Sequence, residues 1–175
     1  MDAMNFELPE ELRILKDAVR RFVDKELIPI EREACDGPKL KPEVRRHLEA
    51  KARELGLANY DVPQEYGGLG MGLLAKTVVW AEMARSVALP SRASEIFGPN
   101  VSPILYYLDP EQKQRFLLPT IRGEMKWCFA QTEPDAGGDP GSMRTTAVRQ
   151  GDHYVITGMK RFITGADEAD YAQVF

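Results

Sequence analysis

The residue types best suited to chemistry gather in one short stretch, FAQTEPDAGGDPG, which spans Phe129–Gly141. An apolar, strand-like segment runs there directly into Thr132, an acid–proline pair and three glycines. Glycines reach positive φ easily, so that successive backbone N–H groups can converge on an anion such as a pyrophosphate. The alternative is an ordinary turn between strands, which local composition alone favours. The stretch is not a P-loop, because no Lys-Ser/Thr pair follows, and no helix follows as in a GxGxxG motif.

Two further groups could contact a flat ring. The Thr132 hydroxyl at the end of a strand could donate to a carbonyl or to a ring nitrogen, although such a threonine more often caps a local backbone N–H. Phe162 and Thr164, in the stretch RFIT, combine an aromatic face with a hydroxyl. That pair suits a planar ligand, but the same alternation is typical of any half-buried strand. Both alternatives stay open.

Glu82 is the one acid of residues 73–89, a segment that is apolar nearly all round and therefore typical of a central, buried helix. Glu82 could form the polar end of a pocket, or it could pair with a basic residue such as Arg85, one turn away. Pairing is favoured, because buried acids are usually paired. His47 and His153 have no Ser, Cys or carboxylate at a readable spacing. We therefore predict no catalytic residue and no metal site from these patterns.

Composition limits the class of protein. The chain has 175 residues, of which 43% are hydrophobic, which is enough for one or two domains. The net charge of −4 argues against a nucleic-acid-binding protein. Cys35 and Cys128 form no CxxC pair, which fits free thiols in a reducing compartment. The first residues lack a signal-peptide pattern, and no run reaches the roughly 18 apolar residues of a membrane span. We therefore expect a cytoplasmic protein with no membrane span.

The first two-thirds of the chain is expected to be helical, with apolar residues at three- and four-residue steps. Asp109 and Pro110 are suited to the N-cap and first turn of the last helix. The segment 61–71, DVPQEYGGLGM, is interpreted as a connection that positions helices. The expected helical ranges are about 9–27, 42–56, 73–89, 90–108 and 109–121.

After Gly123 the pattern changes to short strands. Thr145–Arg149 and His153–Thr157 are expected to form a hairpin around Gly151. A third strand is expected around Arg161–Thr164, and ADYAQVF is typical of the opening of a further strand. Because a sheet that stops there would leave an unpaired edge, we expect this chain to be part of a longer one.

Four pieces occur in order: VPQEYGGLGM, DPEQKQRFLLP, CFAQTEPDAGGD and GDHYVITGMKRFITGA. Together they resemble the acyl-CoA dehydrogenase family, from about residue 6 to the last residue, and TEPDAG and G-x-K-x-aromatic-I-T are the most specific elements. The resemblance implies an α+β protein. An N-terminal all-helical domain, 1–122, is followed by the first part of an antiparallel β-barrel-like domain, 123–175, and the family's C-terminal helical domain is absent.

The resemblance also implies FAD as cofactor. Phe129, Gln131 and Thr132 correspond to the segment that holds the pyrimidine side of the flavin, through the backbone of Gln131 and the hydroxyl of Thr132. Phe162 corresponds to the residue that shields the isoalloxazine ring, where many members carry Trp. Thr164 corresponds to a hydrogen-bond donor near the reactive nitrogen.

Two more residues receive a role from the resemblance alone. Gly138 stands where many members have a serine that helps to hold the pyrophosphate or the ligand. Its N–H can still bind, and the lost hydroxyl contact corresponds to about 1 kcal/mol. Glu82 matches a region that borders the acyl pocket and is the implied substrate-binding residue.

The implied reaction is α,β-dehydrogenation of an acyl-CoA thioester, in which a carboxylate takes the α-proton and the flavin takes the β-hydride. The implied electron acceptor is an electron-transfer flavoprotein or a similar partner, and full-length members are expected to be homo-oligomers. The family's base lies on the C-terminal helices, so we expect no catalytic residue and no activity in this chain by itself. The alternatives are an acyl-CoA oxidase or flavin monooxygenase of the same superfamily, or a non-catalytic helical interaction module.

Overall fold

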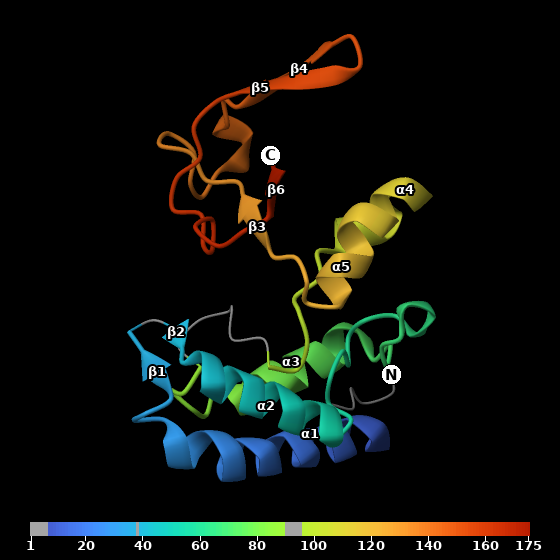
Figure 1. Cartoon of the computed structure of the whole chain (residues 1–175), viewed down its shortest axis with the longest axis vertical. Helices are drawn as coiled ribbons and strands as arrows, with labels where there is room; N and C mark the ends of the chain where they lie inside the picture. Colours follow the sequence, from blue (N-terminus) through green and yellow to red (C-terminus); the bar gives the residue numbers. More distant parts are fainter. Residues whose placement is uncertain (1–6, 38, 90–95) are drawn as a thin grey trace, which may run out of the picture. The chain divides into compact units, whose positions relative to one another are not determined.

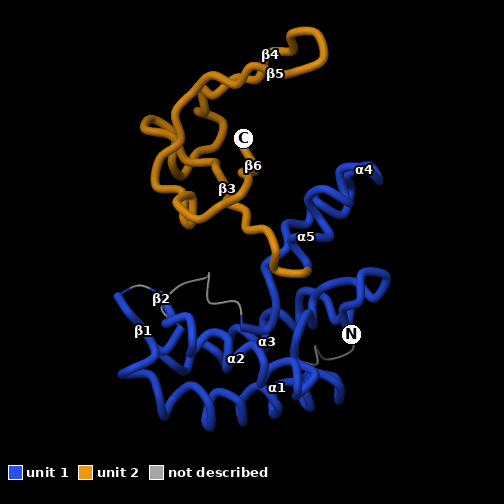
Figure 2. Tube along the Cα trace, viewed as in Figure 1, with its two compact units in different colours: residues 1–121 blue, residues 122–175 orange. Residues whose placement is uncertain are grey.

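The computed structural model describes residues 7–37, 39–89 and 96–175 (Figure 1). The chain divides into two compact units, Met1–Ile121 and Arg122–Phe175 (Figure 2). The expected boundary after residue 122 lies one residue beyond this division. Among the helices that the structure describes, none is both long enough and apolar enough to cross a membrane.

Unit 1 is built on three longer helices, α1 (Glu10–Phe22), α2 (Pro42–Glu54) and α3 (Gly72–Met83) (Figure 1). α1 begins with acids and ends with basic residues, which complements the helix dipole. It continues through a π-helical turn, Val23–Leu27, and a 3-10 turn, Ile28–Ile30, so the predicted helix is confirmed. Its apolar stripe packs into the core of the unit, whose fully buried large side chains include Phe22, Leu27, Leu48, Val19 and Val79.

α2 begins at Pro42 as predicted, and Gly56, with φ +68°, follows its end. A short antiparallel pair, β1 (Cys35–Asp36) with β2 (Lys39–Leu40), precedes it. The predicted connection at 61–71 contains a 3-10 turn, Gln64–Tyr66.

α3 is shorter than expected, because it ends at Met83. It buries one face against α1, and the opposite face leaves Leu73 79% and Trp80 42% exposed within the described structure. The expectation of a helix buried all round is therefore wrong for this chain as described. Hydrophobicity alone does not say how many neighbours a helix has.

The helix expected at 90–108 is wrong where the structure can test it, and its residues 90–95 lie outside the described part. From Ile96 the chain is irregular, and only Pro103–Tyr107 form a 3-10 turn. Gly98 has φ +112°, and a Cβ there would lie 2.2 Å from an Asn59 side-chain oxygen, so this backbone cannot be helical.

The last helical segment of unit 1 is confirmed. Asp109 and Gln112 form a reciprocal capping box at the start of α4 (Pro110–Gln112). The helix continues through a π-helical turn, Lys113–Leu117, into α5 (Leu118–Ile121).

Unit 2 contains two separate strand pairs. β3 (Trp127–Ala130) pairs with β6 (Tyr171–Val174), and β4 (Thr146–Gln150) pairs antiparallel with β5 (His153–Thr157). The predicted hairpin and the predicted closing strand are confirmed. The β3–β6 pair is parallel, and the described strands close no barrel, so the architecture is a mixed helix and sheet arrangement.

The third strand expected around Arg161–Thr164 is wrong. The structure places these residues in an irregular segment, in which Phe162 has φ +58°. A left-handed residue interrupts the extended conformation that a strand requires. The aromatic–polar alternation in RFIT therefore has another cause than strand geometry.

Candidate functional site

β3 buries Cys128 and Ala130, and strand alternation turns Phe129 to the other side, where it is 47% exposed. The Phe129 ring contacts the Phe175 ring at 4.5 Å between centroids. Phe129 therefore lies at the surface of the strand.

The carbonyl groups of the next two residues, Gln131 and Thr132, accept hydrogen bonds from residues 160 and 161, at the start of the RFIT segment. Lys160 Nζ donates to the Gln131 carbonyl at 2.8 Å, and the Arg161 backbone N–H donates to the Thr132 carbonyl at 2.8 Å. The Thr132 side chain is half-buried, and its hydroxyl has no hydrogen-bond partner among residues 7–37, 39–89 and 96–175. The structure thus brings the TEPDAG motif and the start of RFIT together, and it leaves the Thr132 hydroxyl available.

Phe162 combines backbone strain with exposure. Its left-handed φ of +58° is unfavourable for a bulky residue by on the order of 1–3 kcal/mol. The ring is nevertheless 79% exposed, and the Arg161 guanidinium lies 4.4 Å from the ring centroid. Thr164 lies exposed in the turn that follows. Folding stability alone does not account for an exposed aromatic ring in such a conformation. The implied flavin contacts of the Thr132 and Thr164 hydroxyls stay predictions.

The glycine cluster differs from the expectation in one respect. Gly137, Gly138 and Gly141 do not have positive φ, so the predicted left-handed conformation is wrong there. A Cβ at Gly137 or Gly138 would meet no atom within 4 Å. Internal packing therefore imposes no need for glycine at these two positions. The Asp139 carboxylate holds the following turn by accepting from the Gly141 N–H at 2.9 Å.

A largely buried ion pair, which the sequence patterns did not predict, adjoins these residues. Lys160 Nζ lies 2.9 Å from Glu133 Oε1, and the two side chains are 13% and 5% exposed. The Glu133 carboxylate also accepts from the backbone N–H groups of Arg144 at 2.6 Å and of Thr145 at 2.9 Å. The available signal was that one of the two most specific motifs, TEPDAG, contains acids and the other, GMKRFIT, contains basic residues.

These contacts favour the charged form of Glu133. The Thr145 hydroxyl, the Arg144 N–H and the Lys160 ammonium lower the pKa of Glu133 to about 2. The Thr145 hydroxyl oxygen is buried and lacks the geometry of a hydrogen bond, so we attribute the effect mainly to the amides and the ammonium.

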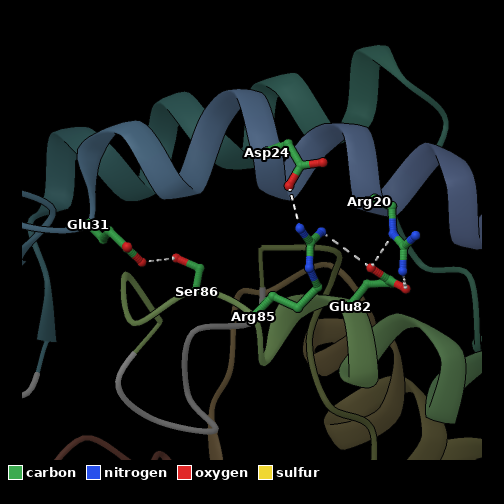
Figure 3. Close-up of polar contacts among 6 residues, drawn as sticks. All are labelled: Arg20, Asp24, Glu31, Glu82, Arg85 and Ser86. Atoms are coloured by element: carbon green, nitrogen blue, oxygen red, sulfur yellow. Dashed lines mark hydrogen bonds and ion pairs between the residues drawn. The ribbon is translucent and has the colours of Figure 1, made fainter.

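Glu82 lies in unit 1 and is paired there (Figure 3). Arg20 binds its carboxylate with two nitrogens, Nε to Oε2 at 3.0 Å and Nη2 to Oε1 at 2.9 Å, while Arg85 Nη1 approaches Oε2 at 3.4 Å. The hydrogen bonds from Arg20 lower the pKa of Glu82, against the effect of burial, and the charges of Arg20 and Arg85 act in the same direction. The pairing interpretation is confirmed, with Arg20 as the main partner. The predicted contact of Glu82 with a substrate stays a prediction.

Further polar contacts join the turns after α1 to the residues after α3 (Figure 3). Arg85 Nη2 binds Asp24 at 2.7 Å. Glu31 Oε2 accepts from the Ser86 hydroxyl at 3.0 Å and from the Val87 N–H at 2.9 Å. Three carboxylates, Asp24, Glu31 and Glu82, thus connect α1 and the turns that follow it to α3 and the residues after it, which is a structural role.

Two family descriptions match consecutive parts of the chain. "Acyl-CoA dehydrogenase, N-terminal domain" matches residues 9–124, and "Acyl-CoA dehydrogenase, middle domain" matches residues 128–175. The first match alone covers more than half of the chain.

Known proteins agree with these matches. The chain is 38% identical over 173 residues to a mitochondrial short-chain specific acyl-CoA dehydrogenase of Sus scrofa, and the match covers 97% of this chain and 40% of that protein. A crystal structure of a glutaryl-CoA dehydrogenase from Mycobacterium smegmatis in complex with FADH2 is similar with a TM-score of 0.72 at 28% identity, over 95% of this chain and 42% of that one. A structure described under the electron transferring flavoprotein of Acidaminococcus fermentans is similar with a TM-score of 0.69 at 32% identity, over 96% of this chain and 44% of that one. The chain therefore spans about 40% of the length of the relatives it matches.

Proposed function

Because this chain belongs to the acyl-CoA dehydrogenase family, we propose that unit 2 forms one wall of an FAD site in an enzyme that oxidises the Cα–Cβ bond of an acyl-CoA thioester. The observation that carries the proposal is the junction of two motifs, in which the Arg161 N–H binds the Thr132 carbonyl at 2.8 Å. This contact sets a free hydroxyl beside a segment with an exposed, strained aromatic ring.

We call this part of unit 2 the flavin wall, and each of its central residues, Gln131, Thr132, Phe162 and Thr164, has a proposed role. The Gln131 backbone and the Thr132 hydroxyl bind the pyrimidine side of the flavin, because the carbonyls of both residues are engaged with residues 160 and 161 and the Thr132 hydroxyl remains. Phe162 covers one face of the isoalloxazine ring and excludes water from it. The Thr164 hydroxyl donates near the reactive nitrogen. The chemistry that FAD supplies when bound is acceptance of the β-hydride of the thioester.

Two further contacts are proposed, one at Gly138 and one at Phe129. The Gly138 N–H is proposed to bind the pyrophosphate, and the open space around its Cα supports this role, because a side chain would occupy that space. Phe129 is proposed to flank the flavin from the exposed side of β3.

Substrate and partners are proposed for the whole protein, of which the chain matches about 40% in its relatives. The substrate is an acyl-CoA thioester, and the electron acceptor is an electron-transfer flavoprotein or a similar carrier. The whole protein is proposed to be a cytoplasmic homo-oligomer in fatty acid metabolism. For the 175-residue chain alone we expect no turnover of acyl-CoA with an artificial electron acceptor.

Amide NMR spectra of the 175-residue chain with added ligand test the flavin wall. We expect riboflavin near its solubility limit to shift the amides of Gln131, Thr132 and Phe162, and ADP at about 1 mM, a concentration that detects weak binding, to shift those of Gly137 and Gly138 instead. The matched control is Thr157→Val in the β5 strand, which should leave the shifts intact, whereas Thr132→Val should reduce them. Shifts that fall only in unit 1, or none at all, would contradict the proposal.

A further inference from the structure

Glu133 and Lys160 form a closed polar cluster between three segments of unit 2. The Lys160 ammonium has three N–H donors and meets three acceptors, the Gln131 carbonyl at 2.8 Å, Glu133 Oε1 at 2.9 Å and Met143 Sδ at 3.6 Å. The Glu133 carboxylate binds the backbone at residues 144 and 145 with its two oxygens. The two side chains therefore connect the segments around residues 131–133, 143–145 and 160–161.

Apolar packing in this region is sparse. In the part of unit 2 that the structure describes, the buried apolar residues are Cys128, Ala130 and Ala136, which are all small. Every residue of β4 and β5 is exposed. Hydrophobic burial therefore contributes little to the relative position of these loops, and the charge-assisted contacts of Glu133 and Lys160 join them.

We propose that Glu133 and Lys160 are positioning residues that hold the Gln131–Thr132 segment against residues 160–164, and so set the two parts of the proposed flavin wall at a fixed separation. The proposal depends on the proposed function for its ligand. Neither side chain is assigned a contact with the flavin. Lys160 acts through the Gln131 carbonyl, and its neighbour Arg161 binds the Thr132 carbonyl.

The direction of the Gln131 and Thr132 carbonyl groups explains why the Glu133–Lys160 ion pair would affect ligand binding. A trans peptide unit directs its C=O and N–H to opposite sides, so the Gln131 carbonyl held by Lys160 fixes the direction of the Thr132 N–H, away from the ammonium. Without Lys160 the Gln131 carbonyl loses its partner, and the peptide is free to rotate. The hydroxyl of Thr132 would then lose its fixed orientation as well.

Hydrogen–deuterium exchange of the 175-residue chain, read by amide NMR, tests the positioning role of Glu133 and Lys160 without any ligand. Lys160→Met keeps the length of the side chain and removes its donors. We expect exchange of the Arg161, Arg144 and Thr145 amides to accelerate by about tenfold or more, while the β4–β5 hairpin keeps its rates, because only a local opening is involved. The matched control is Lys126→Met, which removes an exposed Lys–Glu pair of the same 2.9 Å length in the same unit.

Amide shifts caused by riboflavin are a second measurement, and their recovery in a conservative variant is a third. Where the wild-type amides of Thr132 and Phe162 shift with riboflavin, Lys160→Met should abolish the shifts in a folded chain, and Lys160→Arg, which keeps a charged donor, should restore most of them. A purely structural role predicts instead that exchange rises equally throughout unit 2.

The outcomes separate the two hypotheses. The positioning role would be overturned by an unchanged exchange rate of the Arg161 amide in Lys160→Met. It would also be overturned by a uniform rise in exchange rates that includes the β4–β5 hairpin. Absence of any riboflavin shift in the wild type would count against the flavin wall, while the exchange rates would still decide whether Glu133 and Lys160 fix the two segments.

Discussion

Replacement of the buried Glu82 carboxylate by an amide is the sharpest test of unit 1. Glu82→Gln keeps the shape of the side chain and removes its charge. The side chain of Glu82 is 4% exposed and receives two hydrogen bonds from Arg20, at 2.9 and 3.0 Å. In the variant, an NH₂ group faces the donors of Arg20 and Arg85, so at least one donor loses its acceptor.

The expected loss of stability depends on two facts: the Glu82 side chain is buried, and the Arg20 side chain is half-exposed. Hydrogen bonds to charged groups contribute about 1.5–3 kcal/mol, and the Arg20 side chain, 49% exposed, can recover water when it loses its partner. We therefore expect the free energy of unfolding to fall by about 1–2 kcal/mol in Glu82→Gln. For a unit of this size the fall in Tm is roughly 3–10 °C.

Thermal unfolding followed by far-ultraviolet circular dichroism measures this change, because the helices lie in unit 1. The control is Glu54→Gln, which breaks a surface pair with Lys51 at 3.5 Å and should change stability by less than about 0.5 kcal/mol. Equal Tm values for the two variants would refute the reasoning.

The same variant makes a prediction about pH. The pKa of Glu82 is lowered from its ordinary value of 4.5, so its contribution is fully present above that pH and is lost as the pH falls through the lowered value. The stability difference between wild type and Glu82→Gln should therefore be largest at neutral pH and should shrink well below pH 4.5. A difference that grows in acid would contradict the assignment.

Two further substitutions test the backbone of unit 1. A Cβ at Gly68 would lie 2.0 Å from the Val62 carbonyl oxygen, so Gly68→Ala should lower the free energy of unfolding by about 1–3 kcal/mol in urea titrations. Gly137→Ala, where a Cβ meets nothing within 4 Å, is the control and should leave stability unchanged. Asp109→Ala removes the capping box and should lower stability by about 1 kcal/mol. Wild-type urea midpoints for Gly68→Ala or Asp109→Ala would contradict these geometries.

Local patterns in the sequence predicted the elements whose causes are themselves local. The amphipathic period of α1, the start of α2 at Pro42 and the Asp109 cap depend on residues within one or two turns of each other. The β4–β5 hairpin depends on its own turn at Gly151. These features need no information about distant parts of the chain, which is why composition and spacing were sufficient.

The predictions that were wrong concern segments whose conformation depends on contacts with distant residues. Residues 96–102 are irregular because Gly98 is held against Asn59, which is far away in the sequence. The RFIT segment is not a strand because its backbone turns at Phe162, beside the contact between residues 161 and 132. In each case a distant contact determines the backbone conformation, and local propensity does not encode that contact.

By itself, the sequence determined the kind of fold and the order of its motifs, and the residues of the proposed flavin wall stay predictions made from it. Only the tertiary structure decided which charges meet. Arg20 rather than Arg85 is the main partner of Glu82, and Lys160 joins Glu133 across 27 positions of the chain. The physical reason is that a charge interacts with whatever the fold brings within a few ångströms, and spacing along the chain predicts such a neighbour only within a single helix or hairpin.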